Sequence, residues 1–145
     1  MTRLVALDPG SKKCGLLLVD LEKALVLDGK VVECSHVVDL IMSWRDKGDL
    51  KGIVLGNGTS SNFWYMKLES FFSIEVVEEK GTTLRARKRY WELFPMPRWL
   101  NWLPKGLFVP SKPLDAIAAL ILLEDYLEMK LHWSEPMNFK IWPEP

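Results

Sequence analysis

The sequence predicts one α/β domain built on a mixed sheet, in which antiparallel strands come first and parallel strands follow. Four short, largely apolar runs are typical of strands buried in a sheet, and they occupy residues 4–7, 16–19, 53–55 and 74–77. Before residue 36 only turns separate the apolar runs, whereas after it strands alternate with stretches of helical periodicity. Such alternation gives parallel strands joined by right-handed crossovers. A length of 145 residues suits one domain of this kind.

Composition indicates a globular protein without an overall charge. Hydrophobic residues make up 48% of the chain and charged residues 26%, which excludes a disordered chain. The longest apolar runs are shorter than a membrane span, so we expect a cytoplasmic protein with no membrane association. A net charge of zero argues against nucleic-acid binding by bulk charge and directs attention to individual residues. Cys14 and Cys34 lack metal-ligand spacing and are expected to be ordinary buried thiols.

Asp8 is the residue around which the rest of the chain is interpreted, because it ends an apolar strand. Pro9 cannot donate a hydrogen bond to a sheet and Gly10 frees the backbone, so the first strand must stop at Asp8. A second strand follows after a short loop that carries Lys12 and Lys13. Burial of a carboxylate is costly unless a partner compensates it. Asp8 therefore either accepts hydrogen bonds from the turn it opens or belongs to a metal or phosphate site.

The next elements follow in the order strand, helix, strand, helix, strand, helix. Asp28-Gly29 is a tight-turn signal, so the neighbouring apolar runs hold either a third strand in one arm or one long strand that bends. The later elements are a helix at 36–48, a strand at 52–55, a helix with Trp64, Leu68, Phe71 and Phe72 on one stripe, a strand at 74–77, and a helix from Thr82 or Thr83 to Leu93.

A polar loop of small residues, 56–61, connects the fourth strand to a helix. Such a loop directs backbone N–H groups outward and favours an anion such as phosphate, which would place Asn57 and Thr59 near it. The alternative is an ordinary strand-to-helix connection with a serine N-cap.

The last third of the chain holds an unusual segment and a final helix. Residues 94–112 are rich in proline and aromatic residues, which excludes a long helix, and their tryptophans suit either stacking on bases or packing against a core. A helix is predicted from Pro113 to about Leu131. Residues 132–145 are expected to be an irregular tail, which leaves a domain at 1–131.

Three acidic residues are predicted to converge at one edge of this sheet. Asp8 ends the first strand, Glu79 (or Glu78) follows the fifth, and Asp115 opens the last helix on its apolar face. Carboxylate oxygens are the ligands that Mg²⁺ and Mn²⁺ prefer, and two such ions activate water and neutralise the leaving oxygen in phosphodiester hydrolysis. Other catalytic sets are absent from the sequence: it has no credible Ser-His-Asp triad, neither cysteine has a plausible general base, and there is no Walker-type loop.

Three blocks of sequence also carry a resemblance to a known family. They are Asp8-Pro9-Gly10 with Gly15, Glu78-Glu79-Lys80-Gly81-Thr82-Thr83, and the run from Asp115 to Leu122. In this order they resemble the YqgF/RuvX family of the ribonuclease H-like superfamily, described as Holliday-junction resolvases and as pre-16S ribosomal RNA processing nucleases. The first block is closer to RuvC resolvases, and residues 53–59 are similar to the YqgF-like domain of Tex transcription accessory proteins. The resemblance implies a ribonuclease H-like fold with a five-stranded mixed sheet flanked by helices.

The resemblance implies a site as well. By position, Asp8, Glu79 and Asp115 are the catalytic and metal-binding acids, and Mg²⁺ or Mn²⁺ is the cofactor. The residues expected to bind nucleic acid surround them and are Lys12, Lys13, Asn57, Thr59, Lys80, Thr82, Thr83, Arg85, Lys88 and Arg89. The last three share a helix face that either contacts phosphates or is only solvated. Two departures are Lys80, where the family usually has Arg, and the lack of an acid after the fourth strand, where RuvC-type enzymes have Glu.

Two functions follow from these residues. The first is a metal-dependent nuclease, a monomer or homodimer, that acts on structured RNA such as pre-16S rRNA or on branched DNA such as a Holliday junction. The alternative is a nucleic-acid-binding module that has lost catalysis, as the similarity to Tex suggests. An ATPase of the sugar-kinase or actin type is disfavoured, because the sequence lacks its second phosphate loop.

Overall fold

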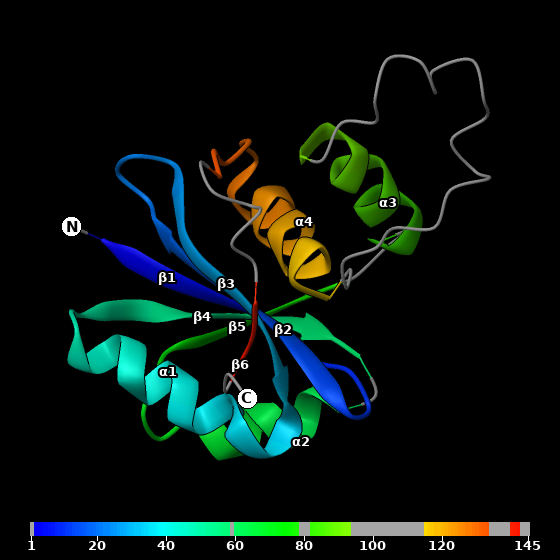
Figure 1. Ribbon diagram of the computed structural model, residues 1–145. Helices are drawn as coiled ribbons and strands as arrows, with labels where there is room; N and C mark the ends of the chain where they lie inside the picture. The colour runs from blue at the N-terminus through cyan, green and yellow to red at the C-terminus, as the bar shows by residue number, and fades with distance from the viewer. Residues whose placement is uncertain (1, 59, 79–81, 94–114, 134–139, 143–145) are drawn as a thin grey trace, which may run out of the picture.

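In the part of the chain that the structure describes, helices cover both faces of one sheet (Figure 1). The computed structural model describes residues 2–58, 60–78, 82–93, 115–133 and 140–142. The strands are β1 Arg3–Asp8, β2 Lys13–Asp20, β3 Leu25–Glu33, β4 Leu50–Asn57, β5 Ile74–Glu78 and β6 Lys140–Trp142. The helices are the 3-10 turn η1 Cys34–His36, α1 Val37–Asp46, α2 Ser61–Leu68, α3 Thr82–Leu93 and α4 Asp115–Leu127. No helix within these ranges is long and apolar enough to span a membrane.

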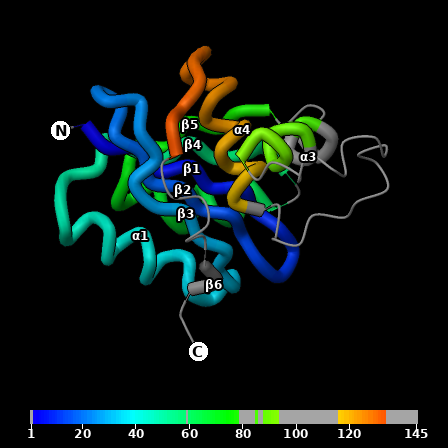
Figure 2. Tube along the Cα trace, turned by 45° about the horizontal axis from the view of Figure 1, so that its top comes forward, coloured from blue at the N-terminus to red at the C-terminus, as the bar shows by residue number. Residues whose placement is uncertain are grey.

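The sheet has the predicted mixture of strand directions. Its order is β5-β4-β1-β2-β3-β6, and Figure 2 shows the first five strands in that sequence. β2 runs antiparallel to both β1 and β3, whereas β4 runs parallel to both β1 and β5. The prediction of an antiparallel meander followed by parallel strands is therefore confirmed, and the sheet carries a sixth strand, β6, beyond the five expected.

β1 is buried on both faces because helices pack on each side of it. α4, with α3 outside it, lies over one face of the sheet, and α1 and α2 lie over the other (Figure 1). Leu4 and Ala6 belong to the core beneath α4, whereas Val5 and Leu7 belong to the core beneath α1 and α2. We call these two sides the α4 face and the α1–α2 face. The alternation along β1 then assigns every later residue of the strand to one face or the other.

β3 is one long strand that bends, so the second of the two interpretations of residues 24–32 is correct. Leu18 pairs with Asp28 and Val19 with Val26, which leaves Leu27 as an extra residue in a β-bulge. The Asp28 carboxylate accepts a hydrogen bond from the indole N–H of Trp44 at 3.2 Å, and this contact ties the bend to α1. The Asp28-Gly29 turn signal therefore marks a distortion within a strand and no chain reversal.

The tail differs from the irregular segment expected for residues 132–145. His132 forms an isolated parallel bridge with Leu25, and β6 pairs in parallel with β3. Without β6, the outer edge of β3 would present unpaired N–H and C=O groups, and an added strand satisfies them. A strand of three residues carries too little sequence pattern to be predicted. The domain boundary at residue 131 stays a prediction.

Two helices end earlier than the sequence predicted. α2 stops at Leu68, so Phe71 leaves the expected buried stripe and is 55% exposed. α4 ends at Leu127, four residues before the predicted end. The next residue, Glu128, adopts a left-handed conformation with φ of 54°, which terminates the helix.

Arg3 joins the start of β1 to the end of α1. Its guanidinium is 7% exposed and donates hydrogen bonds to the carbonyl oxygens of Trp44, at 2.6 Å, and Gly48. The Trp44 carbonyl belongs to the last turn of α1, where a cation is favoured by the helix dipole, and Gly48 follows shortly after that helix. The exposed residues Asp46 and Lys47 therefore lie at the end of the sheet opposite Asp8.

Gly29 offers a test of the packing between β3 and the tail. A Cβ atom at this position would lie 2.7 Å from two ring atoms of Trp133 and 3.1 Å from Leu17 Cδ1. We expect Gly29→Ala to lower the free energy of unfolding by about 1–3 kcal/mol through overpacking. Urea unfolding followed by circular dichroism measures it. The control is Gly58→Ala, whose added methyl meets no atom within 4 Å and should change stability by less than about 0.5 kcal/mol. Equal losses in both variants would contradict the assigned packing.

Candidate functional site

Asp8 lies at the tip of β1 on the α4 face. It is half-buried, and its backbone pairs with Gly15 of β2. It follows Leu4 and Ala6 in the alternation of the strand, so its side chain takes the same side of the sheet as theirs. A Cβ atom on Gly10 would collide with the carbonyl oxygen of Lys13, so this position requires glycine for the chain to turn sharply after Asp8.

β4 and β5 end beside the tip of β1, because all three strands are parallel. Leu7 pairs with Leu55, and Asn57 pairs with Glu78 at the ends of β4 and β5. Val77 packs into the core on the α4 face, so its neighbour Glu78 takes the α1–α2 face. Glu78, the alternative candidate acid, is therefore on the opposite side of the sheet from the Asp8 carboxylate.

α4 crosses the sheet with its first residue toward Asp8. After α4 the chain reaches His132, which bridges to Leu25 in the same row of the sheet as Arg3, at the start of β1. The C-terminal end of α4 therefore lies over the start of β1. Its 13 residues span about 20 Å, as do the six residues of β1, so the N-terminal end of α4 lies toward the tip of the strand (Figure 1).

The predicted metal ligands are only partly within the described structure. Among the described residues, no group of three or more His, Cys, Asp or Glu is arranged to hold a metal ion. Glu79 and the side chain of Asp115 lie outside that part, so the ligand set of Asp8, Glu79 and Asp115 stays a prediction. The donors fit Mg²⁺ or Mn²⁺ by chemistry, because all three are carboxylates and the located one is half-buried at a strand tip.

The loop residues predicted to bind nucleic acid divide into described and undescribed positions. Lys12 is exposed in the turn that follows Asp8, and Lys13 is exposed as the first residue of β2. Asn57 is also exposed, and its Oδ1 accepts a hydrogen bond at 3.2 Å from the hydroxyl of Ser61 at the start of α2. Thr59, Lys80 and the side chains of Thr82 and Thr83 lie outside the described part.

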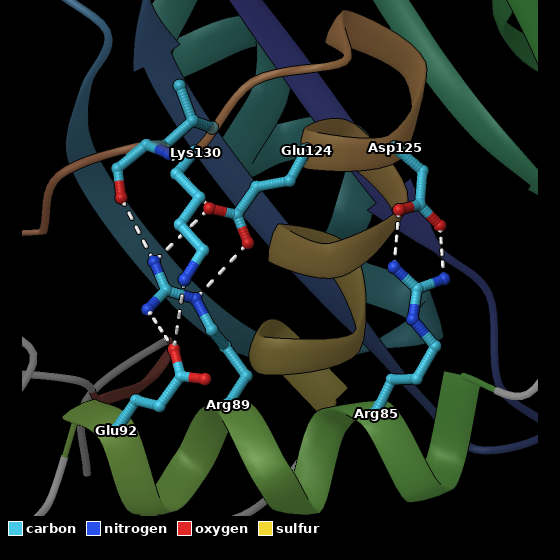
Figure 3. Close-up of polar contacts among 7 residues, drawn as sticks. Arg85, Arg89, Glu92, Glu124, Asp125 and Lys130 are labelled. Carbon is cyan, nitrogen blue, oxygen red and sulfur yellow. Dashed lines mark hydrogen bonds and ion pairs between the residues drawn. The ribbon is translucent and has the colours of Figure 1, made fainter.

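Two arginines of α3 are paired with acids of α4 (Figure 3). Both terminal nitrogens of Arg85 contact the Asp125 carboxylate at 2.5 Å, and this guanidinium holds the pKa of Asp125 below its usual value. Arg89 donates two hydrogen bonds to Glu124, at 3.2 and 3.1 Å, and a third to the carbonyl oxygen of Leu131. A phosphate that binds these arginines must compete with carboxylates already in place, whereas Lys88 is exposed.

Sequence reasoning missed the acidic partners of α3. Glu124 is only 11% exposed and also accepts the backbone N–H of Leu131 at 2.8 Å. The only sequence signal was an excess of arginine on α3 and of acids near the end of α4. A pairing between residues 35 to 40 positions apart has no local periodicity.

A second feature that the sequence did not reveal lies behind the Asp8 turn. A pocket of about 290 Å³ is formed by Pro9, Gly10, Ser11, Cys34 and the first turn of α2. Cys34 and Trp64, which both line it, pack on the α1–α2 face. The pocket and the Asp8 carboxylate therefore lie on opposite sides of one turn.

Comparisons with known proteins give a structural likeness and no family. No family model and no curated protein matches the chain. Among solved structures, T. thermophilus RuvC in complex with a Holliday junction substrate is similar at 16% sequence identity and a TM-score of 0.48, over 91% of this chain and 100% of that one. A TM-score of 0.48 at 16% identity is too low to establish a shared fold. The fold is therefore described by the order and direction of its strands alone. Membership of the YqgF/RuvX family stays a prediction.

The α3–α4 ion pairs predict unequal effects for the two arginines. Arg89→Met should lower the free energy of unfolding by about 2–3 kcal/mol, because it leaves the largely buried Glu124 carboxylate without its cation. Arg85→Met is the matched control. Both partners of that pair are about half exposed, so the loss should stay below about 1 kcal/mol. Chemical denaturation of the wild type and the two variants measures these free energies of unfolding. A larger loss of stability for Arg85→Met than for Arg89→Met would refute the assigned ion pairs.

Proposed function

We propose that the protein is a divalent-metal-dependent nuclease that hydrolyses phosphodiester bonds in structured nucleic acid. The observation that carries the proposal is the position of Asp8. Its carboxylate is half-buried at the tip of the central strand, on the face that α4 covers, and the N-terminal end of α4 lies toward the same tip. Carboxylate oxygens are the ligands that Mg²⁺ and Mn²⁺ prefer, and a strand tip holds this one in a fixed place.

Asp8, Glu79 and Asp115 would hold the metal. Their carboxylates repel one another when they are close, and this repulsion favours a bound cation. A divalent ion would lower the pKa of bound water and neutralise charge on the leaving oxygen. The chain itself would fix the position of the Asp8 carboxylate. It does so through the sharp turn at Gly10 and the pairing of Asp8 with Gly15.

The exposed lysines next to this site would hold the sugar-phosphate backbone. Lys12 and Lys13 lie at the start of β2, directly after the Asp8 turn, whereas Arg85 and Arg89 of α3 are already paired with acids. A chain with no net charge must bind nucleic acid through such a local group. The substrate we propose is structured RNA, such as a ribosomal RNA precursor, or a four-way DNA junction.

Asn57 favours a second candidate function. It ends β4, where the RuvC-type pattern has glutamate, and its amide oxygen is engaged by the hydroxyl of Ser61. A site that lacks one acid binds metal less strongly, which suits a module that binds nucleic acid without cleaving it. The two candidates share the fold and the lysines and differ in whether cleavage occurs.

Asp8→Asn tests the nuclease directly. This change removes one negative charge with almost no change in volume, so Mn²⁺-dependent cleavage of a structured RNA or four-way junction should fall more than about 100-fold. Asp46→Asn is the matched control, because Asp46 is exposed at the opposite end of the sheet, and it should cleave like wild type. A gel-based cleavage assay measures both. Wild-type protein that binds these substrates but never cuts them, with either metal, would favour the binding module.

The lysines are tested by the salt dependence of binding. We expect the double variant Lys12→Ala/Lys13→Ala to weaken binding of all nucleic-acid sequences alike and to reduce the slope of log K against log salt by about 2. The double variant Lys47→Ala/Lys51→Ala, altered at the other end of the sheet, should retain the wild-type slope. Fluorescence anisotropy across a salt series gives both values. Equal slopes in the two variants would exclude the turn as the phosphate contact.

A further inference from the structure

The two cysteines are diagonal neighbours across two strands, since Cys14 pairs with Val32, two residues before Cys34. Cys14 lies in β2, and Cys34 follows directly after β3, where its backbone N–H donates to the carbonyl oxygen of Lys12 at 3.1 Å. The ladder between the strands thus continues to Cys34 and holds both backbones in register. Both side chains take the α1–α2 face, and their Sγ atoms are 3.7 Å apart. A disulfide needs about 2.05 Å, so the sulfurs must approach by less than about 2 Å, a distance within reach of side-chain rotation.

The surroundings of the two thiols differ. Cys14 is fully buried among apolar side chains, and burial raises the pKa of its thiol to about 12. Cys34 is half-buried and lines the pocket behind the Asp8 turn, where its Sγ lies 3.7 Å from the Gly10 carbonyl oxygen. An oxidant can therefore reach the Cys34 sulfur from the pocket, whereas the Cys14 sulfur is buried. The first reaction is therefore expected at Cys34, whereas Cys14 can react only with a group already bound to Cys34, whose sulfur lies 3.7 Å away.

We propose that Cys34 is a site of thiol oxidation and that Cys14 resolves it into an intrachain disulfide. The oxidant is the disulfide of a small thiol, such as oxidised glutathione. The Cys34 thiolate attacks one sulfur of this disulfide, the S–S bond breaks, and one glutathione leaves as a thiolate that takes up a proton. Cys14 then loses its proton to water and attacks the Cys34 sulfur, which releases the second glutathione. Two protein thiols lose two electrons, and one glutathione disulfide gains them.

Oxidation also changes the turn that follows Asp8. In the reduced protein the Cys34 thiol is placed to donate to the Gly10 carbonyl oxygen, and Gly10 closes that turn. A disulfide has no thiol proton, so this contact is lost. The covalent chemistry itself does not depend on the proposed nuclease activity, and it is tested without an activity assay.

The test uses the full chain, reduced and then exposed to oxidised glutathione. Free thiols are blocked with iodoacetamide, and the intact mass and a non-reducing digest are measured. We expect loss of two hydrogens, no alkylation, and a cross-linked peptide pair containing Cys14 and Cys34. Dithiothreitol should restore both thiols. Retention of two alkylatable thiols, or cross-links only between chains on a non-reducing gel, would overturn the proposal.

Two variants assign the order of attack. Cys14→Ala should stop at the mixed disulfide, with one glutathione attached to Cys34, whereas Cys34→Ala should leave Cys14 unmodified. A glutathione adduct on Cys14 in Cys34→Ala would show that the pocket does not select Cys34. If Cys14→Ala fails to fold, the wild-type mass and the Cys34→Ala variant still decide.

Discussion

The arrangement depends on the burial of β1 between two helical layers. Leu4 and Ala6 are covered by α4, and Val5 and Leu7 by α1 and α2, so the strand is fixed from both sides up to Asp8. Parallel pairing with β4 then brings the ends of β4 and β5 to the same edge. Because both cores hold this apolar strand, the position of the charged residue at its end is fixed. A metal ligand requires such a rigid position.

Strand order and direction could be predicted because their signals are local. Apolar runs such as Leu16–Val19 and the alternation of strand and helix after residue 36 are read directly from the sequence. The distortion at Leu27 and the strand β6 could not be predicted, since each depends on a neighbour distant in sequence. The end of the first strand at Asp8 could be predicted because Pro9 and Gly10 cannot continue a strand. The face taken by Glu78 could not be predicted, because it depends on the register of β5, which places Glu78 on the face opposite Asp8.

The α3 helix shows why a basic face is weak evidence for nucleic-acid binding. The sequence pattern predicts phosphate contacts for Arg85 and Arg89. Both are instead paired with acids of α4, which lie 40 residues from Arg85 and 35 residues from Arg89. These ion pairs hold α3 against the outer side of α4, and Arg89 also secures the Leu131 carbonyl at the point where the chain returns to the sheet. Among the described residues predicted to bind nucleic acid, the exposed cations Lys12 and Lys13 are the ones next to Asp8, where the proposed chemistry would take place.

The central claim is that Asp8 binds a divalent cation together with the acid that opens α4. Crystals soaked in Mn²⁺ and measured near the manganese absorption edge test it most directly. The account predicts an anomalous peak about 2.0–2.4 Å from an Asp8 carboxylate oxygen, with an oxygen of Asp115 also in the coordination shell. The absence of a peak at Asp8 at saturating Mn²⁺, or an Asp115 side chain that points away from it, would contradict the account.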